Sequence, residues 1–428
     1  MDTIFAQATA VGRAGVCVIR ISGPQAHSIG TLMAGPLPDP RASALRMIKG
    51  RDGSFIDQSL VLSFTAPQSF TGEDVVEFHL HGSIAITKRV LTELGEFDGV
   101  RLAHPGEFTR RALENGQLDL VQVEGLADLI EAETEAQRKQ ALRVLSGNLG
   151  QKVEDWRKAL IRAAALLEAT IDFADEDVPV DVTDEVRDLL NAVVSTLDIE
   201  ISGTQVAERI RTGFEVAIVG APNVGKSTLL NRLAGREAAI TSNIAGTTRD
   251  VIEVRMDLGG LPVTLLDTAG IRESTDEIET LGIELAVRRA ADADMCIFLL
   301  EEGDEPPMEP SASDVVLLAK ADLKDNTAGG ISGFTGEGVE KLLERLESEL
   351  SLRAAGAGLA THARHAVAMT RAREGIVEAL NLLVAGPDCY DLVSAELRMA
   401  VHAFEVLVGR IDAENLLDEI FASFCLGK

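Results

Sequence analysis

The stretch FEVAIVGAPNVGKST, residues 214–228, decides the fold. Its first part is a run of apolar residues, which is typical of a buried parallel strand. GAPNVGKS, Gly220–Ser227, fits the phosphate-binding P-loop pattern and is followed by the helical stretch TLLNRLAG. In such a loop backbone N–H groups surround the phosphates, a lysine reaches the β- and γ-phosphates, and a hydroxyl ligates Mg²⁺. The strand–loop–helix order therefore predicts an α/β nucleotide-binding domain.

Three further segments follow in the order of a small GTPase. GTTRD, Gly246–Asp250, supplies a switch threonine, and LPVTLLDTAG, Leu261–Gly270, ends a strand at an aspartate. AKAD, Ala319–Asp322, stands where translation-factor-like GTPases carry Asn-Lys-x-Asp. Asp322 can accept the guanine N1–H and N2–H hydrogens, a donor pair that adenine lacks, so the sequence predicts GTP. Loss of the asparagine amide predicts weaker nucleotide binding, by about 1–3 kcal/mol.

The final base-contacting loop is expected at ISGFTGEGV, from Ile331, where only Ser332 matches the usual Ser-Ala-Lys pattern. The residues predicted to bind GTP are Asn223, Val224, Gly225, Lys226, Ser227, Thr228, Ser242, Thr247, Thr248, Asp267, Thr268, Ala269, Gly270, Lys320 and Asp322. Ser227 and Thr248 are the expected Mg²⁺ ligands. Ile271 follows the DTAG segment, and its apolar side chain cannot orient water as the glutamine of Ras-like enzymes does. A P-loop domain that has lost catalysis is the alternative, and the other motifs argue against it.

Composition and charge restrict the class of protein. The chain has 428 residues, 46% of them hydrophobic and 25% charged, which is typical of a soluble globular protein of two or three domains. Residues 1–116 contain 11 Lys and Arg and 12 Asp and Glu, so their net charge is −1 and the remainder carries −27 of the total −28. General electrostatic attraction therefore does not explain a nucleic-acid partner. Four scattered cysteines suit a reducing cytoplasm, and we expect neither a signal peptide nor a membrane partner.

The spacing of apolar residues along the chain predicts a multidomain α/β and α fold. Residues 1–116 mix short strand-like runs with Gly and Pro turns, which indicates an α+β domain. Residues 117–211 have apolar residues at helical spacing, and residues 212–352 alternate between strand and helix patterns. Residues 353–428 again have apolar residues at helical spacing. We therefore predict a Ras-like P-loop domain inserted into a helical domain whose two halves pack together.

Several blocks outside the P-loop carry a resemblance to a known family. DTIFAQAT, VIRISGP, SFTGEDVVEFHLHG, HPGEFTRRALENGQLDL and the terminal FCLGK closely resemble the tRNA-modification GTPases of the MnmE (TrmE) family, nearly end to end. The resemblance implies an N-terminal domain that binds a tetrahydrofolate derivative, in the 5,10-methylene or 5-formyl form, and mediates homodimerisation. It also implies a FAD-dependent MnmG-type partner in a heterotetramer. Together the two proteins add an aminomethyl or carboxymethylaminomethyl group at C5 of the wobble uridine of certain tRNAs.

The resemblance also assigns roles to single residues. Arg20, Glu77, Gln117 and Lys428 match folate-contacting positions, although the family commonly has a basic residue at position 117. Asn223, Ser242, Ile244 and Thr247 match positions that hold K⁺, and the spacing from Asp267 makes Glu279 the expected water-positioning carboxylate. His79 and His81 are a weak metal signal, and packing or ligand hydrogen bonding is the preferred interpretation.

Cys425, in the terminal pentapeptide FCLGK, allows three interpretations. Prenylation is disfavoured because Gly427 is not aliphatic and no polybasic segment precedes it. An incidental thiol is the default, whereas the family match favours a catalytic thiol that acts on the one-carbon transfer.

Two other functions are also compatible with the sequence. A ribosome-assembly or other regulatory switch GTPase would share the G domain, but such proteins usually append a basic RNA-binding domain, and this chain continues into an acidic helical region. A folate-dependent aminomethyltransferase with a regulatory G domain would act without an MnmG-type partner.

Overall fold

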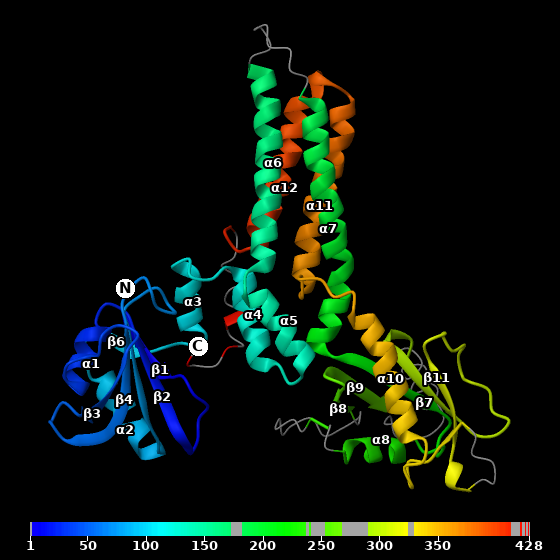
Figure 1. Cartoon of the computed structure of the whole chain (residues 1–428), viewed down its shortest axis with the longest axis horizontal. Helices are drawn as coiled ribbons and strands as arrows, with labels where there is room; N and C mark the ends of the chain where they lie inside the picture. Colours follow the sequence, from blue (N-terminus) through cyan, green and yellow to red (C-terminus); the bar gives the residue numbers. More distant parts are fainter. Residues whose placement is uncertain are drawn as a thin grey trace, which may run out of the picture. The chain divides into compact units, whose positions relative to one another are not determined.

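The computed structural model describes residues 2–172, 182–236, 239–240, 253–267, 290–323, 329–411, 420–421, 424 and 427 (Figure 1). Two compact units are present, one of residues 1–127 with 405–428 and the other of residues 128–404. No helix in the described part is long and apolar enough to cross a membrane.

The first unit contains a six-stranded sheet with the order β3-β4-β5-β2-β1-β6 in its described residues. Its strands are β1 (Thr3–Gln7), β2 (Ala14–Ser22), β3 (Ser43–Lys49), β4 (Phe55–Phe64), β5 (Val75–Gly82) and β6 (Val100–Leu102). Its helices are α1 (Ala26–Ala34), α2 (Ile84–Gly95) and α3 (Glu107–Glu114), and α4 (Leu120–Glu131) spans the boundary between the units.

The two faces of this sheet differ. Alternate residues of the strands, among them Ile19, Val61 and Phe78, form a buried core with residues of α1 and α2. The other face carries Leu45, Leu60 and His79 side by side in register, and both leucines are exposed. Period-two alternation along each strand explains this division, since neighbouring side chains point to opposite faces.

Long helices fill much of the second unit. They are α5 (Glu135–Leu145), α6 (Asn148–Asp172), α7 (Thr183–Thr212), α11 (Ala363–Val384) and α12 (Tyr390–Leu407), with a 3₁₀ turn η2 (Pro387–Cys389). Helix α7 packs against both α6 and α11, so helices on either side of the inserted domain lie together, as the sequence predicts. Trp156 of α6 is buried and its ring centroid lies 5.4 Å from that of Phe404.

The inserted domain is built on a second six-stranded sheet, of order β12-β11-β10-β7-β9-β8 in the described residues. The strands are β7 (Phe214–Gly220), β8 (Glu253–Leu258), β9 (Leu261–Asp267), β10 (Met295–Leu300), β11 (Val315–Ala319) and β12 (Gly330–Ile331). The helices are α8 (Lys226–Ala234) and α10 (Val339–Ala354), with a 3₁₀ turn η1 (Ala321–Leu323). All neighbouring strands are parallel except β8 and β9.

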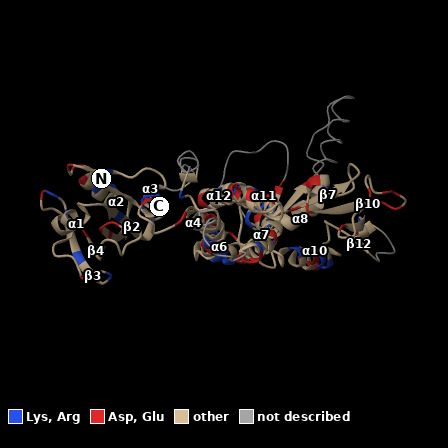
Figure 2. Cartoon of the chain, turned by 90° about the horizontal axis from the view of Figure 1, so that it is seen from above, with Lys and Arg blue, Asp and Glu red and all other residues tan. Residues whose placement is uncertain are grey.

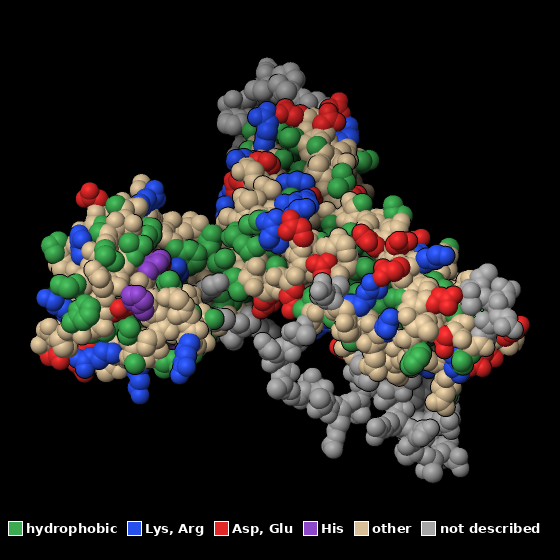
Figure 3. Space-filling view, turned by 60° about the horizontal axis from the view of Figure 1, so that its bottom comes forward, with side chains coloured by type: hydrophobic (Ala, Val, Ile, Leu, Met, Phe, Trp, Pro, Cys, Tyr) green, Lys and Arg blue, Asp and Glu red, His purple; other side chains and the backbone are tan. Residues whose placement is uncertain are grey.

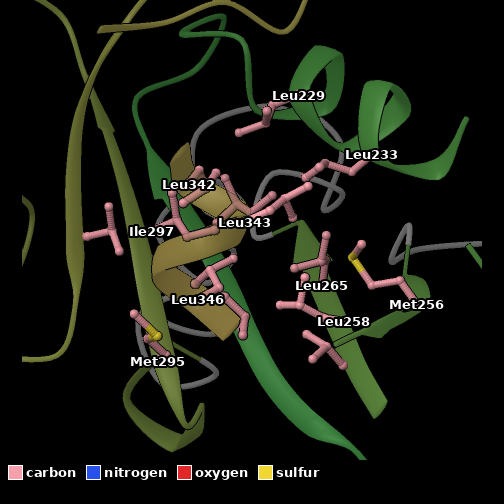
Figure 4. Close-up of a cluster of buried hydrophobic side chains, with 14 of the residues drawn as sticks. Leu229, Leu233, Met256, Leu258, Leu265, Met295, Ile297, Leu342, Leu343 and Leu346 are labelled. Atoms are coloured by element: carbon pink, nitrogen blue, oxygen red, sulfur yellow. The ribbon is translucent and has the colours of Figure 1, made fainter. Parts of the chain in front are cut away.

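Apolar side chains of this sheet and of both helices meet in one core (Figure 4). Leu229 and Leu233 of α8 and Leu342 of α10 pack with Ile297 and Leu265 from the strands. Every residue of β10 is buried, as expected for a central parallel strand. The carboxyl ends of the parallel strands consequently share one edge, and the P-loop lies there.

Candidate functional site

The predicted nucleotide-binding segments meet at the carboxyl edge of the second sheet. The P-loop follows β7, Asp267 ends the adjacent strand β9, and Ala319 ends β11. Strand β7 pairs with β9 on one side and β10 on the other, which makes it the point where the strand order reverses. Ligands of open parallel sheets bind at such a point.

The P-loop backbone takes the conformation that wrapping a phosphate requires. Gly225, directly before α8, has a φ of 114°, and Asn223 has a φ of 61°. Glycine adopts this left-handed region without a steric penalty, and asparagine tolerates it better than most residues. The loop therefore leads into α8 with its N-terminal N–H groups available for an anion.

Lys226 is 5% exposed and lies within the loop itself. Its Nζ donates to the carbonyl oxygens of Gly220, at 2.7 Å, and Ala221, at 2.9 Å. Burial lowers the pKa of Lys226, and the negative charge of Asp267 partly opposes that effect. A buried cation beside the loop can exchange these carbonyl contacts for phosphate oxygens.

Ser227 and Asp267 bring two oxygen ligands together. The Ser227 Oγ donates to Asp267 Oδ2 at 2.8 Å, and the Asp267 side chain is buried. A hydroxyl and a carboxylate oxygen side by side match the ligands that Mg²⁺ prefers. The arrangement fits the predicted metal position, in which Ser227 coordinates directly and Asp267 supports the shell.

The base-recognition segment has an unusual feature. Ala319 is 2% exposed and belongs to the apolar core of the domain, so a methyl group stands where other GTPases place an amide. Lys320 has a φ of 57°, and its Nζ donates to Glu301 Oε1 at 2.6 Å. Asp322 lies in η1 and is exposed, so its carboxylate is accessible to a ligand.

Ser332 and Gly333 form the start of the final predicted loop. Ser332 is buried, and its Oγ accepts a hydrogen bond from Thr335 N at 3.1 Å. A Cβ on Gly333 would lie 2.6 Å from the backbone nitrogen of Leu229 in α8. This close approach explains why glycine stands where the family pattern has alanine.

The first unit places two predicted folate-contacting residues in direct contact. Arg20 Nε donates to Glu77 Oε1 at 2.8 Å across the β2–β5 pair. The Arg20 guanidinium lies over the rings of Phe70, at 5.2 Å, and Phe108, at 5.6 Å. His79 Nε2 lies 3.3 Å from the second carboxylate oxygen of Glu77. These contacts hold both side chains at the partly exposed face of the sheet.

The two strand histidines each contact a carboxylate of the protein. His81 Nδ1 lies 2.9 Å from Asp57 Oδ1, and Asp57 Oδ2 accepts the backbone N–H of His81. Among the residues that the structure describes, no group of three His, Cys, Asp or Glu could hold a metal ion. Packing or ligand hydrogen bonding stays the prediction for these two residues.

Gln117 and the end of the chain lie in the same unit. Gln117 is exposed, and its side chain is close to Gly72 in the loop before β5. Gly427 packs so closely on the backbone of Gln7 and Ala8, beside β1, that a Cβ there would be 2.1 Å from the Gln7 oxygen. Phe421 contacts Gly106. The described part of the tail thus lies on the N-terminal domain.

Ten predicted site residues lie outside the described residues: Ser242, Ile244, Thr247, Thr248, Thr268, Ala269, Gly270, Glu279, Cys425 and Lys428. Their roles remain predictions. The sequence reasoning missed Phe70, Phe108 and Glu301, each of which contacts a predicted residue. No local spacing links them to their partners, because each contact depends on long-range pairing.

The chain is similar in sequence to known proteins over its whole length. The model of the GTP-binding protein TrmE N-terminus matches residues 3–117, and that of the MnmE helical domain matches residues 120–425. The tRNA modification GTPase MnmE of Roseobacter denitrificans is 64% identical, and that of Ruegeria pomeroyi 61%, each over 428 residues and the full length of both chains. A crystal structure of Aquifex aeolicus Era bound to GDP·AlF4⁻ is 28% identical over 32% of this chain and 56% of its own, with a TM-score of 0.26. The chain belongs to the MnmE family of tRNA modification GTPases.

Proposed function

We propose that this chain is a K⁺-dependent GTPase that modifies tRNA together with a FAD-dependent MnmG-type partner. The two proteins would add an aminomethyl or carboxymethylaminomethyl group at C5 of the wobble uridine, with the carbon supplied by methylene-tetrahydrofolate. One observation supports this most: the chain joins a phosphate-binding sheet edge to an N-terminal sheet that presents the Arg20–Glu77 pair. We propose that the protein acts in the cytoplasm.

In the G domain, the described residues would bind and orient GTP. Lys226 would neutralise the β- and γ-phosphates, and the α8 N-terminus would add its N–H groups. Ser227 would ligate Mg²⁺, with Thr248 as its second protein ligand and Asp267 in the supporting shell. Bound Mg²⁺ supplies charge neutralisation at the phosphates. Asp322 would accept the guanine hydrogens from its exposed position.

The K⁺ dependence follows from Asn223, whose left-handed backbone sets its position within the P-loop. The amide oxygen of Asn223 would bind K⁺ together with Ser242, Ile244 and Thr247. Bound K⁺ supplies positive charge where other GTPases use an arginine finger. Glu279 would then position the attacking water, since Ile271 cannot.

In the N-terminal domain, Glu77 would accept hydrogens from the aminopyrimidine edge of a pterin. Arg20 already holds one oxygen of Glu77 and would keep the carboxylate aligned. Gln117 and Lys428 would contact other parts of the folate. Cys425 would act as nucleophile or acid–base group, and the packing of Gly427 on Gln7 and Ala8 supports a tail that reaches this domain.

We propose that the protein forms a homodimer through the sheet face that α1 and α2 do not cover. Leu45, Met47 and Leu60 are exposed there, at 58%, 54% and 39%. Hydrophobic side chains (green) and histidines (purple) lie together on the surface of this unit (Figure 3). Apolar side chains grouped on one sheet face are typical of an interaction surface.

Reconstitution tests the whole proposal. The protein, an MnmG-type partner, GTP, K⁺, methylene-tetrahydrofolate and unmodified tRNA would be combined, and the nucleosides analysed by mass spectrometry. We expect a modified wobble uridine that depends on each component. GTP hydrolysis without any modified uridine would favour a regulatory switch GTPase, and modification without the partner would favour an aminomethyltransferase.

A further inference from the structure

The stretch 136–162, which covers most of α5 and the first half of α6, is basic in an otherwise acidic protein. Residues 136–162 contain seven Lys and Arg and two Asp and Glu, so their net charge is 7 − 2 = +5, whereas the whole chain carries −28. The remaining residues therefore carry −33. Over the full bounds of the two helices the balance is smaller, with seven Lys and Arg and five Asp and Glu, a net charge of 7 − 5 = +2. In Figure 2, which views the helices from above, ribbon segments of Lys and Arg (blue) lie beside α6. The basic residues are Arg138, Lys139, Arg143, Lys152, Arg157, Lys158 and Arg162.

A hollow of about 470 Å³ lies where α5 ends and α6 begins. Arg143, Asn148, Gln151 and Lys152 line it on one side, and the backbone-rich linker 356–359 lines it on the other. No described residue forms an ion pair with the exposed Arg143 guanidinium. The hollow thus presents the Arg143 cation and the Asn148 amide to solvent, with the Lys152 cation beside them, while the Gln151 amide donates to Asp155 Oδ1 at 3.0 Å.

The one acid in the hollow is already engaged. Glu200 of α7 is 3% exposed; one of its oxygens contacts Lys152 Nζ, and the other accepts the N–H of Leu359 at 2.9 Å. Arg143, Lys152 and Glu200 together carry +1, and the negative charge is directed inward. An anion approaching from solvent therefore meets the two cations.

Gly356 leaves the floor of the hollow open. A Cβ on Gly356 would meet no atom within 4 Å, and its φ is outside the left-handed region. Neither packing nor backbone conformation requires glycine at this position. A side chain added at this position would project into free space beside the hollow.

Beyond the hollow, the same side of α6 carries the exposed Asp155 and then a further cation, Lys158. Lys158 lies seven residues after Gln151, so both side chains lie on one face of α6 about two turns apart. Lys158 is exposed, and among the described residues it forms no ion pair. Arg143 in the hollow and Lys158 beyond it could therefore contact successive charges of an extended polyanion, which a single small anion does not provide.

We infer that the hollow and the adjoining face of α6 bind the phosphate backbone of the tRNA substrate. Arginine contacts a phosphate through two parallel N–H···O bonds, and lysine acts as a compact cation. Phosphate contacts position an RNA without reading its sequence, which suits a surface that holds the tRNA body. This inference rests on the proposed function, because it takes tRNA as the substrate.

Charge reversal tests the surface. The double variant Arg143→Glu with Lys158→Glu should weaken binding of an unmodified tRNA transcript about tenfold or more at 0.1 M salt. The slope of log Kd against log salt should also fall by about 1.5, since each lost phosphate contact removes roughly 0.7–0.9. Gly356→Asp, which adds a carboxylate where a Cβ has free space, should weaken binding in the same direction.

Matched controls separate this surface from general charge effects. Lys341→Glu with Arg345→Glu makes the same charge change on α10 and should leave tRNA affinity unchanged. Gly356→Ala should bind tRNA like the unsubstituted protein. GTP hydrolysis should be equal in all variants, and the α5–α6 variant should raise the KM for tRNA without lowering kcat.

The outcomes distinguish the inference from the proposed function. If the unsubstituted protein binds tRNA and the α5–α6 and α10 variants bind it equally well, or if no tRNA binding is measurable, the inference is wrong. If tRNA binds through this surface but reconstitution yields no modified uridine, the proposed function fails and the binding surface stands.

Discussion

Ala319 places a single methyl group at the base-recognition position where other GTPases have an asparagine. Its methyl group is buried in the core at the end of β11, where an asparagine amide would bond the base and neighbouring loops. We expect Ala319→Asn to tighten GDP binding by about 1–3 kcal/mol, or roughly 5- to 150-fold in Kd, because the amide restores those hydrogen bonds. Titration calorimetry with GDP measures the change.

Ala319→Ser is the control, since it adds a small polar group that is too short to reach the base. Its GDP affinity should stay close to that of the unsubstituted protein. Equal affinities for all three proteins would show that the lost amide is replaced by another contact, and the expectation of weak binding would then be wrong.

Gly333 is required by a close approach between two segments. A Cβ at this position would lie 2.6 Å from Leu229 N and 2.8 Å from Thr228 C, which are both backbone atoms of α8. We expect Gly333→Ala to lower the free energy of unfolding by about 1–3 kcal/mol, because helix and loop must move apart. GDP affinity should fall as well, since α8 begins with Lys226 and Ser227.

Gly356→Ala serves as the matched substitution, because a Cβ there meets nothing within 4 Å. It should leave stability unchanged or raise it by about 0.4–1 kcal/mol through the unfolded state. Thermal unfolding of both variants, with and without GDP, checks the pair. Equal melting temperatures would contradict the steric argument at Gly333.

At the scale of one element, α3 is fixed to the N-terminal domain by ion pairs. Arg111 lies 2.8 Å from Asp2, 3.1 Å from Glu73 and 3.1 Å from Glu107. Arg101 of β6 lies 2.6 Å from Glu107 and 2.6 Å from Asp2. The Arg111 side chain is only 9% exposed, so removing one of its three carboxylate partners would weaken the compensation of a buried charge.

This network predicts how stability depends on pH. Burial alone would raise the pKa of Glu107, but hydrogen bonds from Arg101, the His104 N–H and Arg111 outweigh it and lower that pKa below 4.5. A pKa lowered by folding stabilises the protein above the unfolded value, and this contribution is lost as pH falls through the folded value. The free energy of unfolding should therefore decrease on acidification below about pH 4.5.

Glu107→Gln tests that dependence. The variant should be less stable than the parent protein at pH 7, and the difference should shrink as the pH is lowered from 5 toward 3. Glu114→Gln, in the same helix, removes an exposed carboxylate that pairs with Arg110 and should change stability by less than about 1 kcal/mol at any pH. A constant Glu107→Gln difference across this range would rule out the linkage.

Elements with a strong local pattern are predictable from the sequence, and contacts between distant elements are not. The apolar run of β10 and the P-loop motif predict a central strand and the helix α8, because both depend on neighbouring residues. Thr134 and Gln137 form a capping box at α5, which is likewise local. The Glu200 contacts to Lys152 and Leu359 N join positions 48 and 159 residues apart, and no periodicity predicts them.

The residues of the candidate sites are likewise predictable where they belong to one local motif, and not where they meet through distant segments. The P-loop motif predicts the positions of Lys226 and Ser227, since strand, loop and helix are consecutive. The Arg20–Glu77 contact needs the pairing of β2 with β5, and the rings of Phe70 and Phe108 under Arg20 come from two other segments. A sequence can name such residues only through a family resemblance, which supplies the tertiary arrangement indirectly.

At the scale of the whole molecule, the inserted domain is tied to the helices on which it stands. The Ala136 N–H of α5 donates to Gly260 O at 3.0 Å, at the turn between β8 and β9. Arg209 of α7 lies 3.0 Å from Asp294, whose Oδ2 also accepts the Glu215 N–H at the start of β7. Strand β9 ends at Asp267 in the nucleotide site, so a shift of this hairpin on GTP binding would act directly on α5.

The rate of GTP hydrolysis in K⁺ and in Na⁺ tests the proposed cation site over the complete catalytic cycle. K⁺ is larger than Na⁺, and a cage of oxygens sized for K⁺ holds Na⁺ poorly, so GTP hydrolysis should be much faster in K⁺ than in Na⁺ at equal ionic strength. Asn223→Gly should remove this preference by deleting the amide. Glycine is the appropriate replacement because the φ of 61° at this position would strain most other residues.

Phosphate release in KCl and in NaCl, for both proteins, measures the effect, and GDP affinity shows whether the loop still binds nucleotide. We expect Asn223→Gly to keep GDP binding, because Lys226 and the α8 N-terminus are unchanged, while its hydrolysis in K⁺ falls to the rate in Na⁺. Equal rates in the two salts for the unsubstituted protein would refute the K⁺ site. A preference that survives Asn223→Gly would move the site away from the Asn223 amide and onto the backbone carbonyls of the neighbouring loop.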